Sequence, residues 1–212
     1  MVSIYQCKSV FQNQLRPLVK QLATWQISPN QVTISAIWLS GVTGLALVQS
    51  TQIAKPFLPT TQSVLLFLPI ALLVRMALNA IDGMLAREYE KTTKFGCILN
   101  ELGDVLSDVL LYLPFALLEG IFAPLIVGIV ILAIVSEMVG VLGYAIDYKR
   151  HYEGPMGKSD RALVFGVIGL ILGWGIEPTQ WLTILLSAVI FLQLWTIGNR
   201  IQGMLQEVES WK

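Results

Sequence analysis

Charged residues are scarce in this chain of 212 residues: aspartate, glutamate, lysine and arginine make up 13% of it, and hydrophobic residues 55%. Soluble domains carry about 25% charged residues, so a deficit of this size indicates that much of the surface faces lipid rather than water. Acidic and basic residues are equal in number and give a formal net charge of zero. The overall charge therefore gives no support for a nucleic-acid partner.

The sequence also has only two cysteines and one histidine. Cys7 and Cys97 lie far apart and form no Cys-x2-Cys pair, so we predict no disulfide framework. His151 stands alone and is expected to be a surface residue rather than a ligand. The N-terminus lacks a short apolar core followed by a small-residue cleavage site, so we expect no cleavable signal peptide.

Long hydrophobic runs dominate the rest of the chain. A helix needs about 20 apolar residues to cross the hydrocarbon core of a bilayer. Six segments approach or exceed that length, and they cover about 31–50, 62–87, 96–118, 121–146, 162–176 and 178–198. We therefore predict an all-α fold, a polytopic membrane bundle of six transmembrane helices, with residues 1–212 forming a single domain.

The segment before the first run is amphipathic. Its apolar residues recur at helical spacing, at Phe11, Leu15, Leu18 and Leu22. Lys20 and several glutamines occupy the other face, a pattern typical of a helix that lies on the cytosolic membrane surface. A helix packed on the bundle would show the same pattern, so both interpretations remain open. Pro17 is a candidate kink within this helix.

Lysine and arginine are unevenly divided between the two sides of the predicted bundle. They gather before the first run, between the second and third, between the fourth and fifth, and after the sixth, whereas the opposite side has only Lys55. Loops rich in lysine and arginine remain in the cytosol. We therefore expect a protein of the cytoplasmic (plasma) membrane, with both termini and the active site on the cytosolic side.

Polar residues cluster where the second run ends and the third begins. The second run ends with Asn-Ala-Ile-Asp-Gly-Met-Leu-Ala-Arg at 79–87, and the third carries Gly96, Asn100, Asp104 and Asp108. With 3.6 residues per turn, each set lies along one helix face. A short connection makes the two helices antiparallel neighbours, so these faces can meet. Their carboxylate and amide oxygens are ligands that Mg²⁺ prefers, and polar groups inside a membrane often mark functional sites.

The cluster resembles the motif of the CDP-alcohol phosphotransferase (CDP-alcohol phosphatidyltransferase) family, Asp-x2-Asp-Gly-x2-Ala-Arg-x8-Gly-x3-Asp-x3-Asp. The matching positions are Asp82, Gly83, Ala86, Arg87, Gly96 and Asp104. At ~6–7% usage per residue type, six such matches arise by chance on the order of once in ten million registers. The stretches Ser-Pro-Asn-Gln-Val-Thr at 28–33 and Gly-Pro-Met-Gly-Lys-Ser-Asp-Arg at 154–161 also resemble members of this family.

The resemblance implies a reaction and a set of site residues. A substituted phosphate group, such as phosphatidyl, would pass from a CDP-alcohol to an acceptor alcohol with release of CMP, in phospholipid or related polar-lipid biosynthesis. The implied ligands of Mg²⁺ or Mn²⁺ are Asn79, Asp82, Asn100 and Asp104, and Asp104 is also the implied catalytic base. The implied substrate-binding residues are Gly83, Ala86, Arg87, Gly96, Lys158 and Arg161. Asp108 is a candidate support one turn behind the ligands.

Asn79 and Asn100 depart from the family, because both positions are aspartate in its motif. Asparagine offers a carbonyl oxygen but no charge, so the motif supplies two negative charges instead of four. Two interpretations remain open: an active branch with weaker metal binding, and a non-catalytic membrane protein that keeps the fold with a degenerate metal site. We favour the active branch because Asp82, Arg87 and Asp104 are intact. A transporter is disfavoured, since the sequence has no internal repeat.

Two features outside the motif predict helix contacts. Arg75 lies one turn before Asn79 and is expected in a buried ion pair, with Glu137 as the candidate partner. Gly169 and Gly173 form a small-x3-small pair. Such a pair suits either a helix contact within the chain or a homodimer interface.

Overall fold

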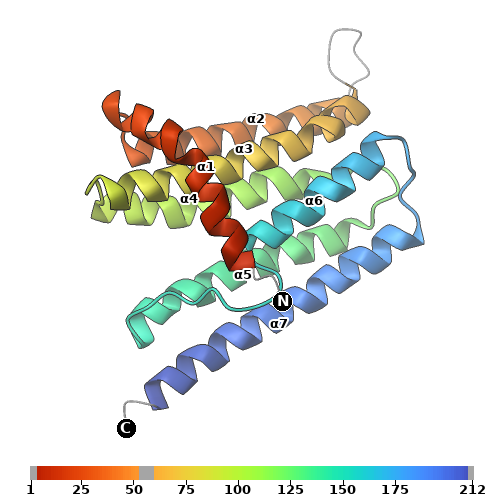
Figure 1. Cartoon of the computed structure of the whole chain (residues 1–212). Helices are drawn as coiled ribbons and strands as arrows, with labels where there is room; N and C mark the ends of the chain where they lie inside the picture. The colour runs from red at the N-terminus through yellow and green to blue at the C-terminus, as the bar shows by residue number, and fades with distance from the viewer. Residues whose placement is uncertain (1–3, 53–59, 210–212) are drawn as a thin grey trace.

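The computed structural model is an all-helical bundle (Figure 1). It describes residues 4–52 and 60–209, which form seven α-helices, one 3-10 helix and no strand. The elements in order are α1 (Ile4–Thr24), α2 (Pro29–Gln52), α3 (Thr61–Glu88), α4 (Lys94–Tyr112), η1 (Leu113–Leu117), α5 (Ala123–Ile146), α6 (Lys158–Gly173) and α7 (Gln180–Glu209). The all-α prediction is therefore confirmed.

Each predicted run corresponds to a helix, and the differences lie at the ends. The third run, predicted to continue to 118, leaves the α-helical form at Tyr112 and continues as η1. The reason is Pro114, which has no backbone N–H to donate to the carbonyl of Leu110 and whose ring crowds that carbonyl. Helix α6 begins at Lys158 rather than 162, and α7 continues past 198 to Glu209.

The bundle is built from close helix pairs. Helix α2 packs on α3 and α4, α3 packs on α6, and α5 packs on α7. In Figure 1, α6 lies between the group formed by α2, α3 and α4 and the pair formed by α5 and α7. At Gly44 of α2, an added Cβ would lie 1.9 Å from the carbonyl oxygen of Leu110 in α4. Only glycine allows the two backbones to approach this closely.

The small-residue pair on α6 contacts α3. A Cβ at Gly169 would lie 2.9 Å from the Leu68 side chain, and one at Gly173 would lie 2.8 Å from Leu66. The predicted helix contact is therefore confirmed as one within the chain. The core beside it includes Tyr112 and Phe165, whose stacked rings are 4.2 Å apart.

Helix α1 crosses the other helices at an angle (Figure 1) and packs on α3. Val19 of α1 is buried in a cluster with Met84 and Leu85 of α3. The packed arrangement is thus the one observed. Leu18, one of the four apolar residues at helical spacing, is exposed. Whether α1 also touches the membrane surface stays a prediction.

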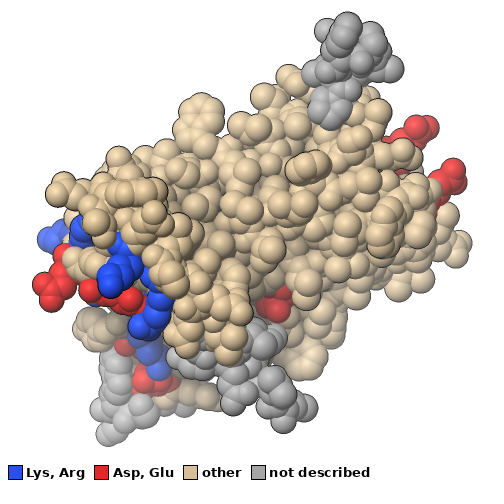
Figure 2. Space-filling view, turned by 45° about the horizontal axis from the view of Figure 1, so that its top comes forward, with Lys and Arg blue, Asp and Glu red and all other residues tan. Residues whose placement is uncertain are grey.

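Four helices of the described chain are long and apolar enough to cross a membrane, with candidate spans at Pro29–Thr51, Thr61–Glu88, Ala123–Ile146 and Gln180–Val208. The other two predicted spans, α4 and α6, do not meet these criteria. Helix α4 carries Lys94, Glu101, Asp104 and Asp108, and α6 has only 16 residues. Figure 2 shows lysine and arginine gathered at one end of the visible face, and acidic side chains among uncharged ones at the opposite end.

Candidate functional site

Asp82 lies buried on α3 and faces α2. The hydroxyl of Thr33 donates a hydrogen bond to Asp82 Oδ2 at 2.8 Å, and only 4% of Asp82 is exposed. Among the described residues, no lysine, arginine or histidine forms an ion pair with this carboxylate. A buried carboxylate without a paired cation is costly, so the position favours a positively charged ligand.

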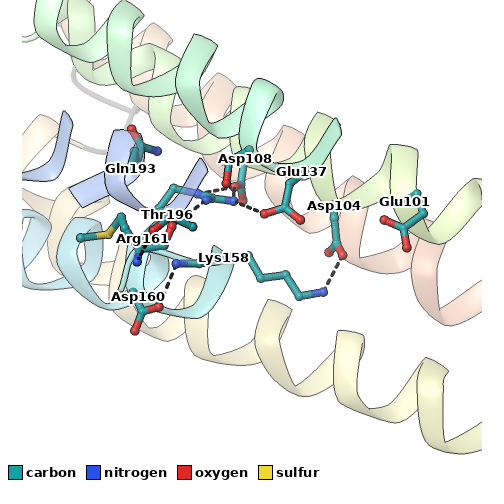
Figure 3. Close-up of polar contacts among 12 residues, drawn as sticks. Glu101, Asp104, Asp108, Glu137, Lys158, Asp160, Arg161, Gln193 and Thr196 are labelled. Carbon is teal, nitrogen blue, oxygen red and sulfur yellow. Dashed lines mark hydrogen bonds and ion pairs between the residues drawn. The ribbon is translucent and has the colours of Figure 1, made fainter. Parts of the chain in front are cut away.

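Asp104 of α4 meets groups from two other helices. The Asn79 side-chain Nδ2 donates to Asp104 Oδ1 at 2.7 Å, and Lys158 Nζ lies 2.5 Å from Asp104 Oδ2. Figure 3 shows the Lys158 side chain extended toward this carboxylate. Asp104 is 4% exposed, whereas the Lys158 side chain is 35% exposed. Lys158 is therefore the more accessible residue of the pair.

Next to Asp104 lies a connected series of buried ion pairs. Arg75 NH1 is 2.7 Å from Asp108 Oδ1, and its NH2 donates to the Asp104 backbone carbonyl at 3.1 Å. Arg161 lies 2.8 Å from Asp108 and 3.0 Å from Glu137 (Figure 3). Arg75 is thus in a buried ion pair as predicted, but its partner is Asp108 and not Glu137.

Glu137 of α5 connects these ion pairs to the loop between α5 and α6. Arg150 lies 2.6 Å from Glu137 Oε2 and also pairs with Glu101, and Arg200 lies 3.7 Å from Glu137 Oε1. One continuous network therefore joins nine charged side chains of the described chain, which are Arg75, Glu101, Asp104, Asp108, Glu137, Arg150, Lys158, Arg161 and Arg200.

The structure brings together some of the predicted site residues and separates others. Asn79, Asp104 and Lys158 are in contact, and Asp82 lies less than one helical turn from Asn79 on α3. Arg161, by contrast, is fully buried and contacts Asp108, Glu137 and the Met156 carbonyl. It therefore supports the site from behind in this structure and does not line its open side.

The remaining predicted residues lie toward the loop between α3 and α4. The Arg87 guanidinium folds back over Gly83, where an added Cβ would lie 3.2 Å from NH2. At Gly96, a Cβ would lie 2.7 Å from Asn30 Oδ1 of α2. Ala86 and Asn100 are half-buried. Both glycines are therefore positions where a side chain would displace a neighbouring polar group.

The donor set fits a divalent cation that keeps other ligands. Asp82 supplies a buried carboxylate, and the Asn79 amide nitrogen bonds to Asp104, so its carbonyl oxygen is the atom that remains to coordinate. Within the described residues, no three His, Cys, Asp or Glu side chains converge as a ready cage. Substrate phosphates and water would have to complete the shell, as is usual for Mg²⁺.

The expectation that His151 is a surface residue is wrong. His151 is 1% exposed, with Nε2 at 2.5 Å from Asp147 Oδ2 and Nδ1 at 3.1 Å from Glu153. A Cβ at Gly143 would lie 2.6 Å from the imidazole ring, so glycine makes room for it. Burial raises the pKa of the Asp147 carboxyl, but the hydrogen bonds from His151 and from the Lys149 backbone N–H, together with the nearby positive charges of these two residues, outweigh burial and hold that pKa below its usual value.

Three polar residues at the site were not singled out from the sequence. Thr33 is the last residue of the Ser-Pro-Asn-Gln-Val-Thr stretch. The resemblance of that stretch to the family indicated that the segment matters, but it assigned no role to the Thr33 side chain. Glu101 lies on the α4 face of Asp104 and Asp108, and that i, i+3, i+7 spacing was a readable signal. Arg150 was seen only as one of several loop cations, and nothing in its local sequence identifies its partners.

The comparisons agree with this architecture. The family model for CDP-alcohol phosphatidyltransferase matches residues 26–195. The chain is 44% identical over 204 residues to the inner membrane protein YnbA of Escherichia coli (strain K12), covering 96% of this chain and 97% of that protein. It is 28% identical over 183 residues to an uncharacterized protein of Aquifex aeolicus (strain VF5), covering 86% and 79% respectively.

A solved structure has the same fold. The crystal structure of Mycobacterium tuberculosis phosphatidylinositol phosphate synthase (PgsA1) with CDP-DAG bound superposes with a TM-score of 0.67 at 17% identity. The match covers 89% of this chain and 92% of that one.

Apolar spans around a buried carboxylate site define a membrane-embedded enzyme, a transferase of phospholipid biosynthesis. More narrowly, the chain belongs to the CDP-alcohol phosphatidyltransferase family, whose members generally depend on a divalent metal.

Proposed function

We propose that this protein transfers a phosphatidyl group from a CDP-linked lipid to an acceptor alcohol, with release of CMP. The observation that carries the proposal is the buried Asp104 carboxylate, held by Asn79 on one oxygen and Lys158 on the other, close to Asp82. The CDP-DAG bound to the Mycobacterium tuberculosis synthase supports a CDP-linked lipid as the donor.

Asp104 would act as the base. Its carboxylate takes the proton from the acceptor hydroxyl. The acceptor oxygen then attacks the β-phosphorus, its new P–O bond forms, and the bond to the CMP oxygen breaks. Asn79 holds Oδ1 in place, and Lys158 balances the buried charge until substrate arrives. Mg²⁺ or Mn²⁺, held by Asn79, Asp82, Asn100 and Asp104, would supply charge stabilisation to the pyrophosphate.

We place the CDP-linked donor at the C-terminal end of α3. Gly83 and Ala86 have small side chains, so a ring or pyrophosphate can approach the helix backbone. Arg87 is exposed and folded over Gly83, where its guanidinium is placed to bind phosphate in a bidentate manner. Gly96 keeps the neighbouring loop close to α2. We place Lys158, the more exposed residue of its pair with Asp104, on the acceptor side.

Arg161 and Asp108 are proposed to act through Lys158 and Asp104. Arg161 lies one turn after Lys158 on α6, and its ion pair with Asp108 fixes α6 against α4. That contact sets the distance over which Lys158 reaches Asp104. These two residues are therefore positioning residues in this proposal.

We also propose that α2 to α7 all cross the cytoplasmic membrane, with both termini and the site on the cytosolic side. Helices α4 and α6 bury their charged faces inside the bundle, which would offset the cost of those charges in lipid. The gathering of lysine and arginine at one end supports the orientation. Membrane lipids surround the bundle, and a homodimer would need a surface other than Gly169 and Gly173, which α3 covers.

Release of CMP separates this function from a non-catalytic protein that keeps the fold. The purified protein in lipid nanodiscs should release CMP from at least one donor in a panel of CDP-alcohols, with Mg²⁺ or Mn²⁺ and candidate acceptors present. Release should require the acceptor and disappear in Asp104→Asn. If the folded protein binds CDP-diacylglycerol but releases no CMP with any acceptor, the non-catalytic alternative holds.

A further inference from the structure

The charges around the candidate site balance almost completely. The nine-residue network contains five cations and four acids, and Asp82 beside it adds a fifth negative charge. Nearly all of these side chains are buried, with Lys158 and Glu101 the most exposed at 35% and 24%. An added charge must therefore be neutralised locally, because buried uncompensated charge is costly.

A CDP-alcohol brings about two negative charges on its pyrophosphate, since each phosphorus keeps one ionised oxygen. One divalent cation neutralises that ligand beside the network and Asp82, whose five positive and five negative charges cancel, and Arg87 at the donor phosphate already adds one positive charge. A second divalent cation would add two more positive charges that no acidic side chain of the network balances. Asn79 and Asn100 supply none of the negative charge that a second ion would need, and Lys158 adds positive charge beside Asp104.

The two aspartates also differ in how their oxygens are used. Both oxygens of Asp104 already accept from side chains of the chain, one from Asn79 and the other from Lys158. Asp82 has a hydroxyl donor in Thr33 but no paired cation among the described residues. The positive charge that the site lacks is therefore at Asp82, and at Asp104 it is already provided by an ammonium group.

We propose that Lys158 takes the place of a second metal ion, so that the site works with a single divalent cation held on the Asp82 side. This inference rests on the proposed function for the identity of the donor. When the donor binds, the Lys158 ammonium lies between Asp104 and the transferring phosphoryl oxygens. It then binds that anion while Asp104 accepts the acceptor proton.

The test is the stoichiometry and spectrum of bound Mn²⁺, measured by electron paramagnetic resonance on the full chain in nanodiscs containing CDP-diacylglycerol. The native protein should saturate at about one ion per chain, without the dipolar broadening of a metal pair about 3.5–4 Å apart. Lys158→Met should tighten Mn²⁺ binding roughly tenfold, because it removes a nearby positive charge. Lys158→Arg should keep the native affinity.

A combined variant, Asn79→Asp with Asn100→Asp and Lys158→Met, restores negative charge and should bind about two ions with the broadened spectrum of a pair. Lys20→Met, on the exposed face of α1, is the matched control and should behave as the native chain. Melting curves establish that each variant is folded.

Saturation of the native chain at about two coupled ions would overturn the inference, as would no bound Mn²⁺ in a folded, donor-stabilised protein. Unchanged Mn²⁺ affinity in folded Lys158→Met would overturn it too. A failure of the proposed function looks different: the native chain would bind one ion and the donor but release no CMP.

Discussion

Lys158 Nζ lies 2.5 Å from Asp104 Oδ2, although 54 positions separate the two residues in the chain. The contact joins the first residue of α6 to the middle of α4. The Asp104 carboxylate is therefore paired with a cation from the chain itself. The arrangement links the loop that precedes α6 to the site on α3 and α4.

Replacing Asp104 by asparagine should abolish CMP release while leaving donor binding at least partly intact. The change keeps the shape of the side chain but removes the proposed base, whose contribution is roughly 100- to 10,000-fold in rate. Donor binding is measured as the rise in melting temperature with Mg²⁺ and CDP-diacylglycerol. Glu177→Gln, at an exposed position before α7, is the control and should retain full activity. Residual release above one tenth of the native rate would rule out Asp104 as the base.

Restoring a carboxylate at Asn79 should change both metal dependence and stability. Asn79→Asp would place two carboxylates in contact, because the native amide lies 2.7 Å from Asp104. Without metal they repel, so the melting temperature should fall. With Mg²⁺ the added charge should lower the concentration for half-maximal CMP release roughly tenfold, equivalent to about 1.4 kcal/mol.

Two further asparagine variants distinguish coordination of the metal ion from repulsion between neighbouring carboxylates. Asn100→Asp should also lower the half-maximal Mg²⁺ concentration, and Asn79→Leu should raise it. Asn13→Asp, on the exposed side of α1, should do neither. If none of the Asn79 and Asn100 variants changes the Mg²⁺ requirement, the two asparagines are not ligands, and the site must be redrawn around Asp82 and Asp104.

Removing Arg161 should destabilise the bundle severely. Arg161→Met would leave Asp108 and Glu137 short of a buried cation, which costs about 3–5 kcal/mol when one partner of a buried pair is deleted. The readout is unfolding in detergent, followed by tryptophan fluorescence. Arg16→Met removes an exposed cation 3.3 Å from Glu88 and should cost about 0–1 kcal/mol. The double variant Arg161→Met with Asp108→Asn should recover part of the loss, and no recovery would argue against the pairing.

The orientation in the membrane can be read with reporters. Cytosolic and external reporters fused after Lys212 should show a cytosolic C-terminus, because lysine and arginine gather on that side. A cysteine placed at Glu177, at the opposite end of the bundle, should react with a membrane-impermeant maleimide in intact cells. The exposed native Cys97, on the site side, should be protected in the same cells. The reverse labelling pattern would contradict the orientation.

The sequence alone determined the helices and the chemistry of the motif. Hydrophobic run length and helical period are local properties, so the order and approximate positions of α2 to α7 were readable, although α7 extends to Glu209 beyond its predicted end at 198. The spacing of Asn79 and Asp82, and of Asn100 and Asp104, places each pair on one helix face by geometry alone. The resemblance to the family rested on the residue types at the motif positions, such as Asp82, Arg87 and Asp104.

Only the tertiary structure decided which polar groups meet. Arg75 pairs with Asp108 and not Glu137, Arg161 is buried behind the site, and His151 is enclosed rather than exposed. The contact between Lys158 and Asp104 is likewise a tertiary contact that the sequence did not predict. Each depends on the rotation and height of one packed helix against another, set by close approaches such as that of Gly44 to Leu110. A local pattern fixes the face of a helix, whereas packing between distant segments fixes what that face touches.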